Sequence, residues 1–141
     1  MLVEVKVKTA RKINEKLKKK TETYLVNKEF FSEAEYSVTA LLTEEHASHL
    51  IEDFEIQSLR ISPIKEIVVR YNGEHTYIAT LKDVWLEDDG TEKYLRYKVL
   101  LWANNLSEAT QHVNDLAREG YDMSIEGVKE VNYILITEEN E

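Results

Sequence analysis

A phrase that occurs twice in the chain constrains the fold more than any other feature of the sequence. Residues 30–42 read FFSEAEYSVTALL, and residues 105–117 read NLSEATQHVNDLA. In each stretch the apolar residues return with the spacing that lines one face of a helix. The repeat therefore predicts two helices at equivalent places in two copies of one unit.

Each stretch carries a serine where its helix is expected to begin. The hydroxyl of Ser32 or Ser107 would accept a hydrogen bond from the free amides of the first turn, and Glu35 completes a capping box after Ser32. A nucleophilic serine is not favoured, because no histidine that could act as its base follows at a consistent place in both copies. Ser32 and Ser107 are therefore predicted to be helix N-caps.

Strand-like runs of β-branched, aromatic and alternating residues surround each expected helix. Asp88-Asp89-Gly90 is a strong hairpin turn signal between two of them. The expected strands are Leu2–Lys8, Thr21–Asn27, Glu55–Ile61, Glu66–Tyr71, Thr76–Leu86, Tyr94–Ala103, Ser124–Val128 and Tyr133–Thr137.

The order of these segments predicts an α+β fold built by tandem duplication of a β-β-α-β-β unit, with mostly antiparallel sheet and one helix per copy. The first copy is expected to span residues 1–72 and the second residues 73–141, joined at Asn72-Gly73. Because a half of ~70 residues buries little core alone, the two copies are expected to pack as a single globular body.

Four short motifs resemble an uncharacterised family, a domain of unknown function. They are Tyr24-Leu25-Val26, the helix start Phe31-Ser32-Glu33-Ala34-Glu35, Phe54-Glu55-Ile56 and Glu66-Ile67-Val68. The family consists of short duplicated proteins from Bacteroides-group bacteria and their phages or mobile elements. Its members often begin the first strand with an aromatic pair, where this chain has Leu2-Val3. The resemblance implies a fold and an intracellular, phage-linked setting, but no catalytic residue.

Composition excludes several classes of protein. The chain has no cysteine, so it has no disulfide framework, no thiolate zinc site and no cysteine nucleophile, which fits a reducing cytoplasm. No apolar run approaches the ~18 residues of a membrane span, so no membrane partner is expected. The net charge of −9 favours solubility or a partner with a basic surface. We therefore expect a cytoplasmic protein.

The positive charge is concentrated in one segment, residues 9–20, which we call the basic hairpin. This segment is expected to be the long loop of the first hairpin. Such a loop is most simply a solvated tip, but it could also contact nucleic-acid phosphates or an acidic protein. Its candidate phosphate-binding residues are Arg11, Lys12, Lys16, Lys18, Lys19 and Lys20.

Aromatic residues gather in the expected hairpin of the second copy. Trp85 and Trp102 fall on its two strands, and Tyr94 and Tyr97 lie on the returning strand. Exposed aromatic rings on a sheet stack on nucleic-acid bases, which makes Trp85 and Tyr97 candidate binding residues. The simpler alternative is that at least one tryptophan packs in the core beneath a helix.

No motif favours a metal, a cofactor or catalysis. His46 and His49 stand three residues apart among carboxylates, as zinc ligands can, but the HExxH arrangement is absent. The four glycines are isolated, so there is no phosphate-binding loop. We therefore predict no metal site, no cofactor and no catalytic residue.

Three functional hypotheses follow. The first is a non-catalytic accessory module that contacts single-stranded or duplex nucleic acid through the basic hairpin. The alternative is a protein-binding regulator that uses the acidic remainder of the molecule as an acidic face, which includes mimicry of nucleic acid toward a host protein. The third is a small enzyme of unknown reaction. The sequence leaves the partner and the oligomeric state open.

Overall fold

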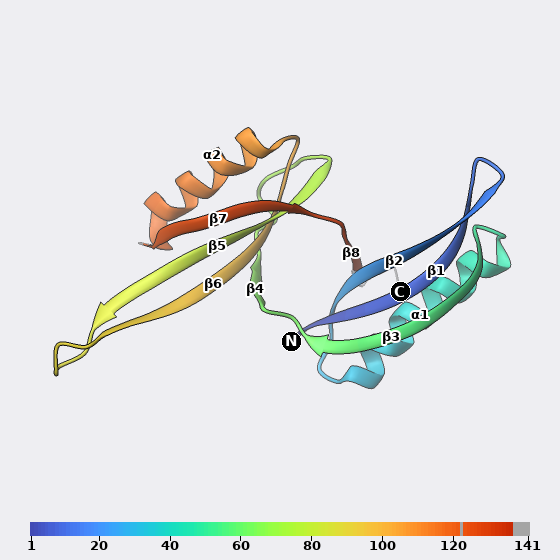
Figure 1. The fold of residues 1–141 in the computed structure, drawn as a ribbon, viewed down its shortest axis with the longest axis horizontal. Helices are drawn as coiled ribbons and strands as arrows, with labels where there is room; N and C mark the ends of the chain where they lie inside the picture. Colours follow the sequence, from blue (N-terminus) through green and yellow to red (C-terminus); the bar gives the residue numbers. More distant parts are fainter. Residues whose placement is uncertain (122, 137–141) are drawn as a thin grey trace. The chain divides into compact units, whose positions relative to one another are not determined.

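The computed structural model describes residues 1–121 and 123–136 (Figure 1). It confirms the α+β class, with two α-helices and two four-stranded sheets in which most neighbouring strands are antiparallel. The chain divides into two compact units. Unit 1 consists of Met1–Ser62 with the residues from Asn132 onward, and unit 2 consists of Pro63–Val131.

The described elements follow one another in an order close to the one expected. They are β1 (Leu2–Ile13), β2 (Lys16–Asn27), α1 (Phe31–Ala47), β3 (Ile51–Ile61), β4 (Ile64–Ile67), β5 (His75–Leu86), β6 (Glu92–Ala103), α2 (Leu106–Leu116), the π-helix η1 (Ala117–Tyr121), β7 (Ser124–Val131) and β8 (Tyr133–Ile136). Thr137, the last residue of the final expected strand, lies outside the described residues.

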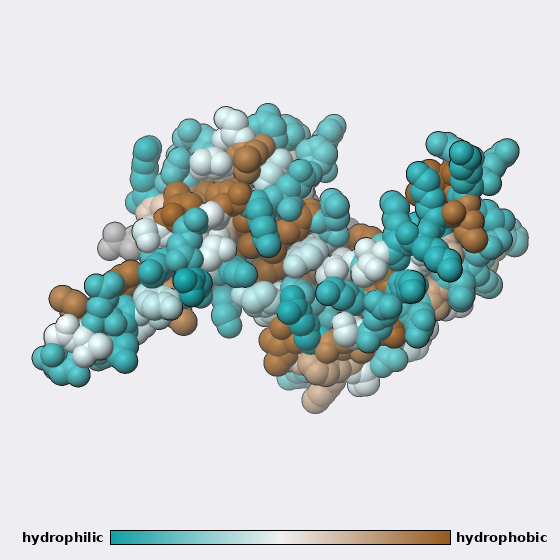
Figure 2. All heavy atoms as spheres, viewed as in Figure 1, coloured by the Kyte–Doolittle hydropathy of each residue, from teal (hydrophilic) through white to brown (hydrophobic). Residues whose placement is uncertain are grey.

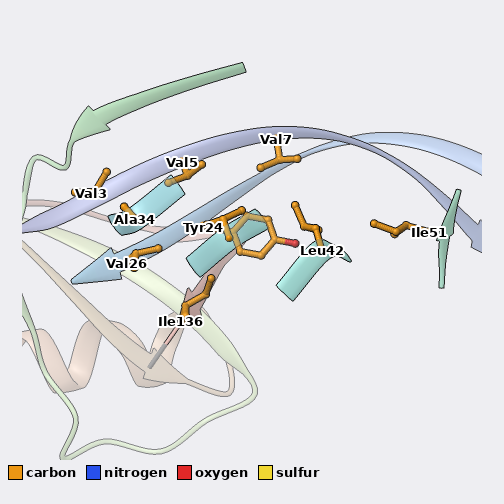
Figure 3. Close-up of a cluster of buried hydrophobic side chains, with 10 residues drawn as sticks. Val3, Val5, Val7, Tyr24, Val26, Ala34, Leu42, Ile51 and Ile136 are labelled. Carbon is orange, nitrogen blue, oxygen red and sulfur yellow. The ribbon is translucent and has the colours of Figure 1, made fainter. Parts of the chain in front are cut away.

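The sheet of unit 1 has the strand order β3-β1-β2-β8. Alternate residues of β1 and β2 face α1, as the period of a strand requires, and each fully buried aliphatic side chain contributes about 1.5–3 kcal/mol. Figure 3 shows the buried side chains of β1 and β2 beside Ala34 and Leu42 of α1, together with Ile51 of β3 and Ile136 of β8. The core consists of Val3, Val5, Val7, Tyr24, Val26, Ala34, Val38, Leu42, Ile51 and Ile136.

The sheet of unit 2 has the strand order β4-β6-β5-β7. Its antiparallel hairpin, β5 and β6, pairs without a bulge from His75 opposite Ala103 to Leu86 opposite Glu92. The predicted turn between these strands is confirmed, and Gly90 adopts the left-handed backbone there, with φ 85°. The core under α2 consists of Val68, Tyr77, Ala79, Leu81, Val99, Leu101, Ala103, Ala109, Val113 and Leu116.

The shortest strand of each sheet lies outside the expected copy that supplies the rest of that sheet. β4 follows β3 directly in the chain, yet it pairs in parallel with β6 in unit 2. β8 follows β7 and pairs in parallel with β2 in unit 1. Each expected copy, residues 1–72 or 73–141, therefore contains the strand that completes the other unit's sheet. That the copies pack as a single globular body stays a prediction.

The prediction that serines cap both helices is wrong. The N-caps are Phe30 and Asn105, and each serine lies inside the first turn. The Asn105 side chain accepts a hydrogen bond from the Glu108 amide at 2.8 Å. An asparagine two residues before Ser107 offers the same kind of acceptor, so α2 begins earlier than expected. Phe30 makes no side-chain cap.

The expectation that residues 9–20 form a long loop is also wrong. β1 and β2 pair in register as far as Ile13 opposite Lys16, and only Asn14 and Glu15 form the turn. Both turn residues have positive φ, 52° and 65°. Asparagine tolerates this conformation well, and a two-residue turn of this kind matches the twist of the flanking strands. The basic hairpin is thus a regular ribbon with a tight turn.

Candidate functional site

The basic hairpin forms a ribbon with one open edge, and only its tip, residues 12–13 opposite residues 16–17, is two-stranded (Figure 1). β3 pairs with β1 as far as Arg11, whereas β8 pairs with β2 only over Thr23–Val26. Within the described residues, the outer edge of β2 from Lys16 to Glu22 has no strand partner. The backbone of this edge and the side chains of residues 16–21 are therefore accessible to a ligand.

The lysines of this ribbon lie on both of its faces. Because side chains alternate along a strand, Lys16, Lys18 and Lys20 fall on the side of the sheet that α1 covers, and Lys12 and Lys19 fall on the other side. All five are exposed. Figure 2 shows mainly hydrophilic side chains over the end of this hairpin. A concentrated positive charge of this kind attracts phosphate groups from two directions.

The lysines differ from one another in their partners. Lys12 Nζ lies 3.4 Å from Glu52 Oε1, an exposed ion pair. In the described part of the chain, no ion pair involves Lys16, Lys18, Lys19 or Lys20. These four lysines are therefore the cations of the basic hairpin that can contact a phosphate without first breaking an internal pair.

Arg11, by contrast, is held inside unit 1. Its guanidinium forms a bidentate pair with the carboxylate of Glu22, and its Nη2 also donates to Glu45 Oε2 at 3.0 Å. The Glu22 carboxylate accepts further hydrogen bonds from Tyr24 Oη at 2.8 Å and Thr9 Oγ1 at 2.9 Å. This cluster of five residues, which we call the Arg11 cluster, ties the ribbon to α1.

The electrostatics of the Arg11 cluster keep its pair charged. Burial alone would raise the pKa of Glu22, but hydrogen bonds from Arg11, Tyr24 and Thr9 outweigh burial and lower it. The hydrogen bond to Glu22 raises the pKa of Arg11. Burial, together with the hydrogen bond to Glu22, raises the pKa of Tyr24. Arg11 is therefore a fixed structural cation, which sequence reasoning did not separate from the exposed lysines.

The two aromatic candidates lie in unit 2, whereas the candidate cations lie in unit 1. Trp85 is 42% exposed, and its Nε1 donates to Glu87 Oε1 at 3.2 Å. Tyr97 is half-buried against the core of unit 2, and its hydroxyl donates to Glu66 Oε2 at 3.2 Å. Trp102 is partly buried, and neither tryptophan belongs to the described cores.

The end of the second hairpin carries an exposed apolar group of which the sequence analysis named only the aromatic members. We call it the apolar tip, and it lies at the end of β5 and β6, where Figure 2 shows brown side chains among pale and hydrophilic ones. The signal was present in the sequence, because apolar residues continue on both faces of the hairpin beyond the part that α2 covers. The apolar tip consists of Val84, Trp85, Leu86, Tyr94 and Leu95.

The histidine pair does not form a metal site in the described residues. His46 lies in the last turn of α1, and His49 follows it with a positive φ of 62°. Across residues 1–121 and 123–136, no group of three or more potential ligand side chains is close enough to hold a metal ion. No helix in the same residues is long and apolar enough to cross a membrane.

Comparison with known proteins gives a family but no relative with a function. Residues 1–139 match the family described as "Domain of unknown function (DUF4494)". The chain belongs to this family. A search of curated proteins and a search of solved structures each found no match. A functional proposal for this DUF4494 chain therefore rests on the geometry of its hairpins.

Proposed function

We propose that the DUF4494 chain is a non-catalytic module that binds the phosphate backbone of nucleic acid through the basic hairpin. One observation carries the proposal. Lys16, Lys18, Lys19 and Lys20 are exposed on the open edge of β2, and within the described residues no carboxylate pairs with them.

The shape of the ribbon favours duplex DNA over a flat anionic surface. The major groove of B-DNA admits a two-stranded β-ribbon, and phosphates line both of its walls. The two-stranded tip of the hairpin, residues 12–13 and 16–17, would enter the groove, and Lys18, Lys19 and Lys20 behind it would reach phosphates from both faces of the sheet. A flat anionic surface would meet only one of these faces. Each phosphate contact releases about one counterion, so binding should weaken steeply as salt rises.

The fixed groups around the ribbon divide its residues into two roles. The Arg11 guanidinium is engaged by Glu22 and Glu45, so we assign it to positioning the ribbon and not to phosphate binding. Tyr97 is assigned to the core of unit 2, and of the two aromatic candidates only Trp85 keeps an exposed ring for stacking. Because the chain as a whole carries −9, we expect the affinity to be modest.

The test is a fluorescence anisotropy titration of labelled duplex and single-stranded DNA at two salt concentrations. The variant carries Lys18→Gln, Lys19→Gln and Lys20→Gln. The matched control carries Lys65→Gln, Arg118→Gln and Lys129→Gln, which remove the same charge from exposed positions of unit 2. The hairpin variant is expected to lose affinity and to lower the slope of log K against log salt by ~2–3, while the control changes little.

Three outcomes decide between the hypotheses. Equal losses of affinity in both variants would show that only the net charge of the chain matters, and would overturn a specific role for the ribbon. Tighter binding to single-stranded DNA than to duplex would indicate that the hairpin contacts the phosphate backbone of a single strand and does not enter a groove. No binding at ~50 mM salt, where electrostatic contact is strong, would overturn the nucleic-acid proposal. The acidic protein-binding regulator would then be the leading function.

The chain is proposed to have arisen by duplication and to act in a cytoplasmic, phage-linked or mobile-element setting. We infer a tandem duplication, because the two sheets share one strand order and the paired hairpin strands are of equal length in both units. Each copy contributes its first three strands and its helix to one sheet, and its fourth strand, β4 or β8, pairs with a strand of the other sheet. A cytoplasmic, phage-linked or mobile-element setting, implied by the family resemblance, would bring such a module near nucleic acid.

A further inference from the structure

The second hairpin also has an open edge, and that edge is not protected by like charges. β4 pairs with β6 only over Lys98–Leu100, so in the described residues the outer edge of β6 from Glu92 to Arg96 has no strand partner. The edge carries Tyr94 and Leu95, which are 52% and 58% exposed. An exposed apolar edge strand offers its backbone to another strand.

Two hydrogen bonds fix which backbone groups of β6 point outward. Leu100 O accepts from Val68 N at 2.8 Å on the β4 side, and Thr91 O accepts from Glu87 N at 2.8 Å on the β5 side. Backbone groups alternate along a strand, and β6 has no bulge against β5. The N–H and C=O groups of Glu92, Tyr94 and Arg96 therefore face the open edge, whereas those of Lys93 and Leu95 face β5.

We propose that the open edge of β6 pairs with the same edge of a second copy of this chain, antiparallel and centred on Tyr94. In this register Tyr94 meets its own counterpart through outward backbone groups on both sides. Glu92 of each copy lies opposite Arg96 of the other, again as a hydrogen-bonded pair. The interface is isologous, so each favourable contact occurs twice.

The side chains of the edge are complementary to themselves in this register. Opposite charges across neighbouring strands stabilise the pairing, and Glu92 with Arg96 gives one such contact on each side of Tyr94. Arg96 Nε already donates to Glu126 Oε2 at 2.8 Å, but a guanidinium has further N–H groups for a second carboxylate. Lys93 lies opposite Leu95 of the other copy, where its aliphatic stem can cover the apolar side chain.

The edge of β2 explains why self-pairing is assigned to β6. An antiparallel pairing of β2 with its own copy, centred on Lys19, would place Lys18 opposite Lys20 and Lys19 opposite itself. Like charges directly opposite one another destabilise a strand pair, and lysines on an edge prevent such association. Of the two open hairpin edges, the β6 edge has the charge pattern that fits a second copy.

The first test uses the unmodified protein. Amide hydrogen exchange is measured by NMR over a wide range of protein concentration. The amides of Glu92, Tyr94 and Arg96 are expected to become protected as concentration rises, while those of Lys93 and Leu95 are protected throughout by β5. Fast exchange of the Tyr94 amide at every concentration, with a monomer in sedimentation velocity, would overturn the proposal.

The second test uses two charge variants and their mixture. Glu92→Arg and Arg96→Glu each place like charges across the symmetric interface, so each alone is expected to raise the dimer Kd about tenfold or more. Mixed together, the two variants restore opposite charges at both contacts and are expected to form a one-to-one heterodimer. Both positions are exposed, and circular dichroism verifies that each variant is folded.

The mixture separates this register from other interfaces. A dimer that survives in both single variants lies elsewhere and overturns the β6 assignment, as does a mixture that stays monomeric while each variant is folded. If either variant fails to fold, Tyr94→Pro replaces both. It removes an outward N–H without removing a bond to β5, so it should abolish the dimer and leave the hairpin intact.

Discussion

The two hairpins share their geometry but differ in the chemistry of their ends. The pair Val3–Val26 in the first hairpin is equivalent to the pair Tyr77–Leu101 in the second. Arg11 follows Val3 along β1 by the same number of residues as Trp85 follows Tyr77 along β5, so Arg11 and Trp85 are at equivalent positions. The same count matches Lys19 and Lys20 of β2 with Tyr94 and Leu95 of β6. The residues near the helix are constrained by a shared core, whereas the ends are free to acquire different binding surfaces.

The difference begins where the core stops. In unit 1, Glu22 lies just beyond the apolar core and needs Arg11, Thr9 and Tyr24 to satisfy its carboxylate. At the equivalent step of unit 2, Tyr97 packs directly against the core and sends its hydroxyl to Glu66. The first ribbon is therefore anchored by a polar network, and the second by apolar packing.

The largest expected effect comes from truncating the equivalent pair Arg11 and Trp85. Arg11→Ala leaves the Glu22 carboxylate without its cation in a largely buried position, so it should lower the free energy of unfolding by about 3 kcal/mol. Trp85→Ala removes an exposed ring and should change the free energy of unfolding by less than about 0.5 kcal/mol. Urea denaturation of both variants measures the difference. Equal losses would contradict the contrast between the two anchors.

A second prediction concerns pH. The folded-state pKa of Glu22 is lowered from the ordinary value of 4.5, so its stabilisation is fully present above that pH and is lost as pH falls through the folded value. Glu22→Gln should cost about 2 kcal/mol at neutral pH, because it removes a charged acceptor from several donors. The variant should also lose less stability than the wild type on acidification. Denaturation series at neutral and acidic pH test this, and parallel curves would refute it.

The two helix starts give a smaller effect. Asn105→Ala should destabilise unit 2 by ~1 kcal/mol, because its side chain accepts from the Glu108 amide. Ser32→Ala and Ser107→Ala should have effects within ~0.5 kcal/mol, since neither serine is an N-cap. Thermal unfolding of the three variants compares them. A loss at Ser107 larger than the loss at Asn105 would restore the serine-cap interpretation.

The turns of the two hairpins give the smallest effect, with opposite signs. Glu15 has a positive φ of 65° without being glycine, so Glu15→Gly should relieve local strain and stabilise the first hairpin by ~0.5 kcal/mol. Gly90 has φ 85° and no atom near its missing Cβ, so Gly90→Ala should destabilise by about 1 kcal/mol through backbone strain alone. Thermal unfolding of both variants gives the signs, and a stabilising Gly90→Ala would exclude the strain argument.

Local patterns in the sequence predicted the element types well. The helical periodicity behind Ser-Glu-Ala placed α1 and α2, and the turn signal at Asp88-Asp89-Gly90 placed the second hairpin. The outer half of the first hairpin was misjudged, because lysine-rich residues lack strand propensity. There, pairing across the ribbon and the bonds from Thr9 and Arg11 to Glu22 stabilise the strand.

Long-range features could not be predicted from one sequence. β4 and β8 are four residues each, and nothing in Ile64–Ile67 or Tyr133–Ile136 indicates which sheet each strand joins. The candidate cations were identified from their residue types alone. The position of Arg11 inside unit 1 also depends on Glu45 of α1, which is distant in sequence although the two side chains are in contact. The apolar tip required the register of β5 and β6, because only the register reveals where the helix stops covering them.

The strand exchange has a consequence for the order in which the chain folds during synthesis. Unit 2 is one continuous stretch, Pro63–Val131, so all of its described strands have been synthesised before Asn132 is made. Unit 1 starts first but must wait for β8, the last described strand, to cover the edge of β2 at Tyr24 and Val26. Domains generally complete in the order of synthesis, but here the N-terminal unit finishes last. A truncated chain that ends at Val131 lacks the strand β8 that unit 1 needs, so protease should cleave it in unit 1 while unit 2 stays resistant.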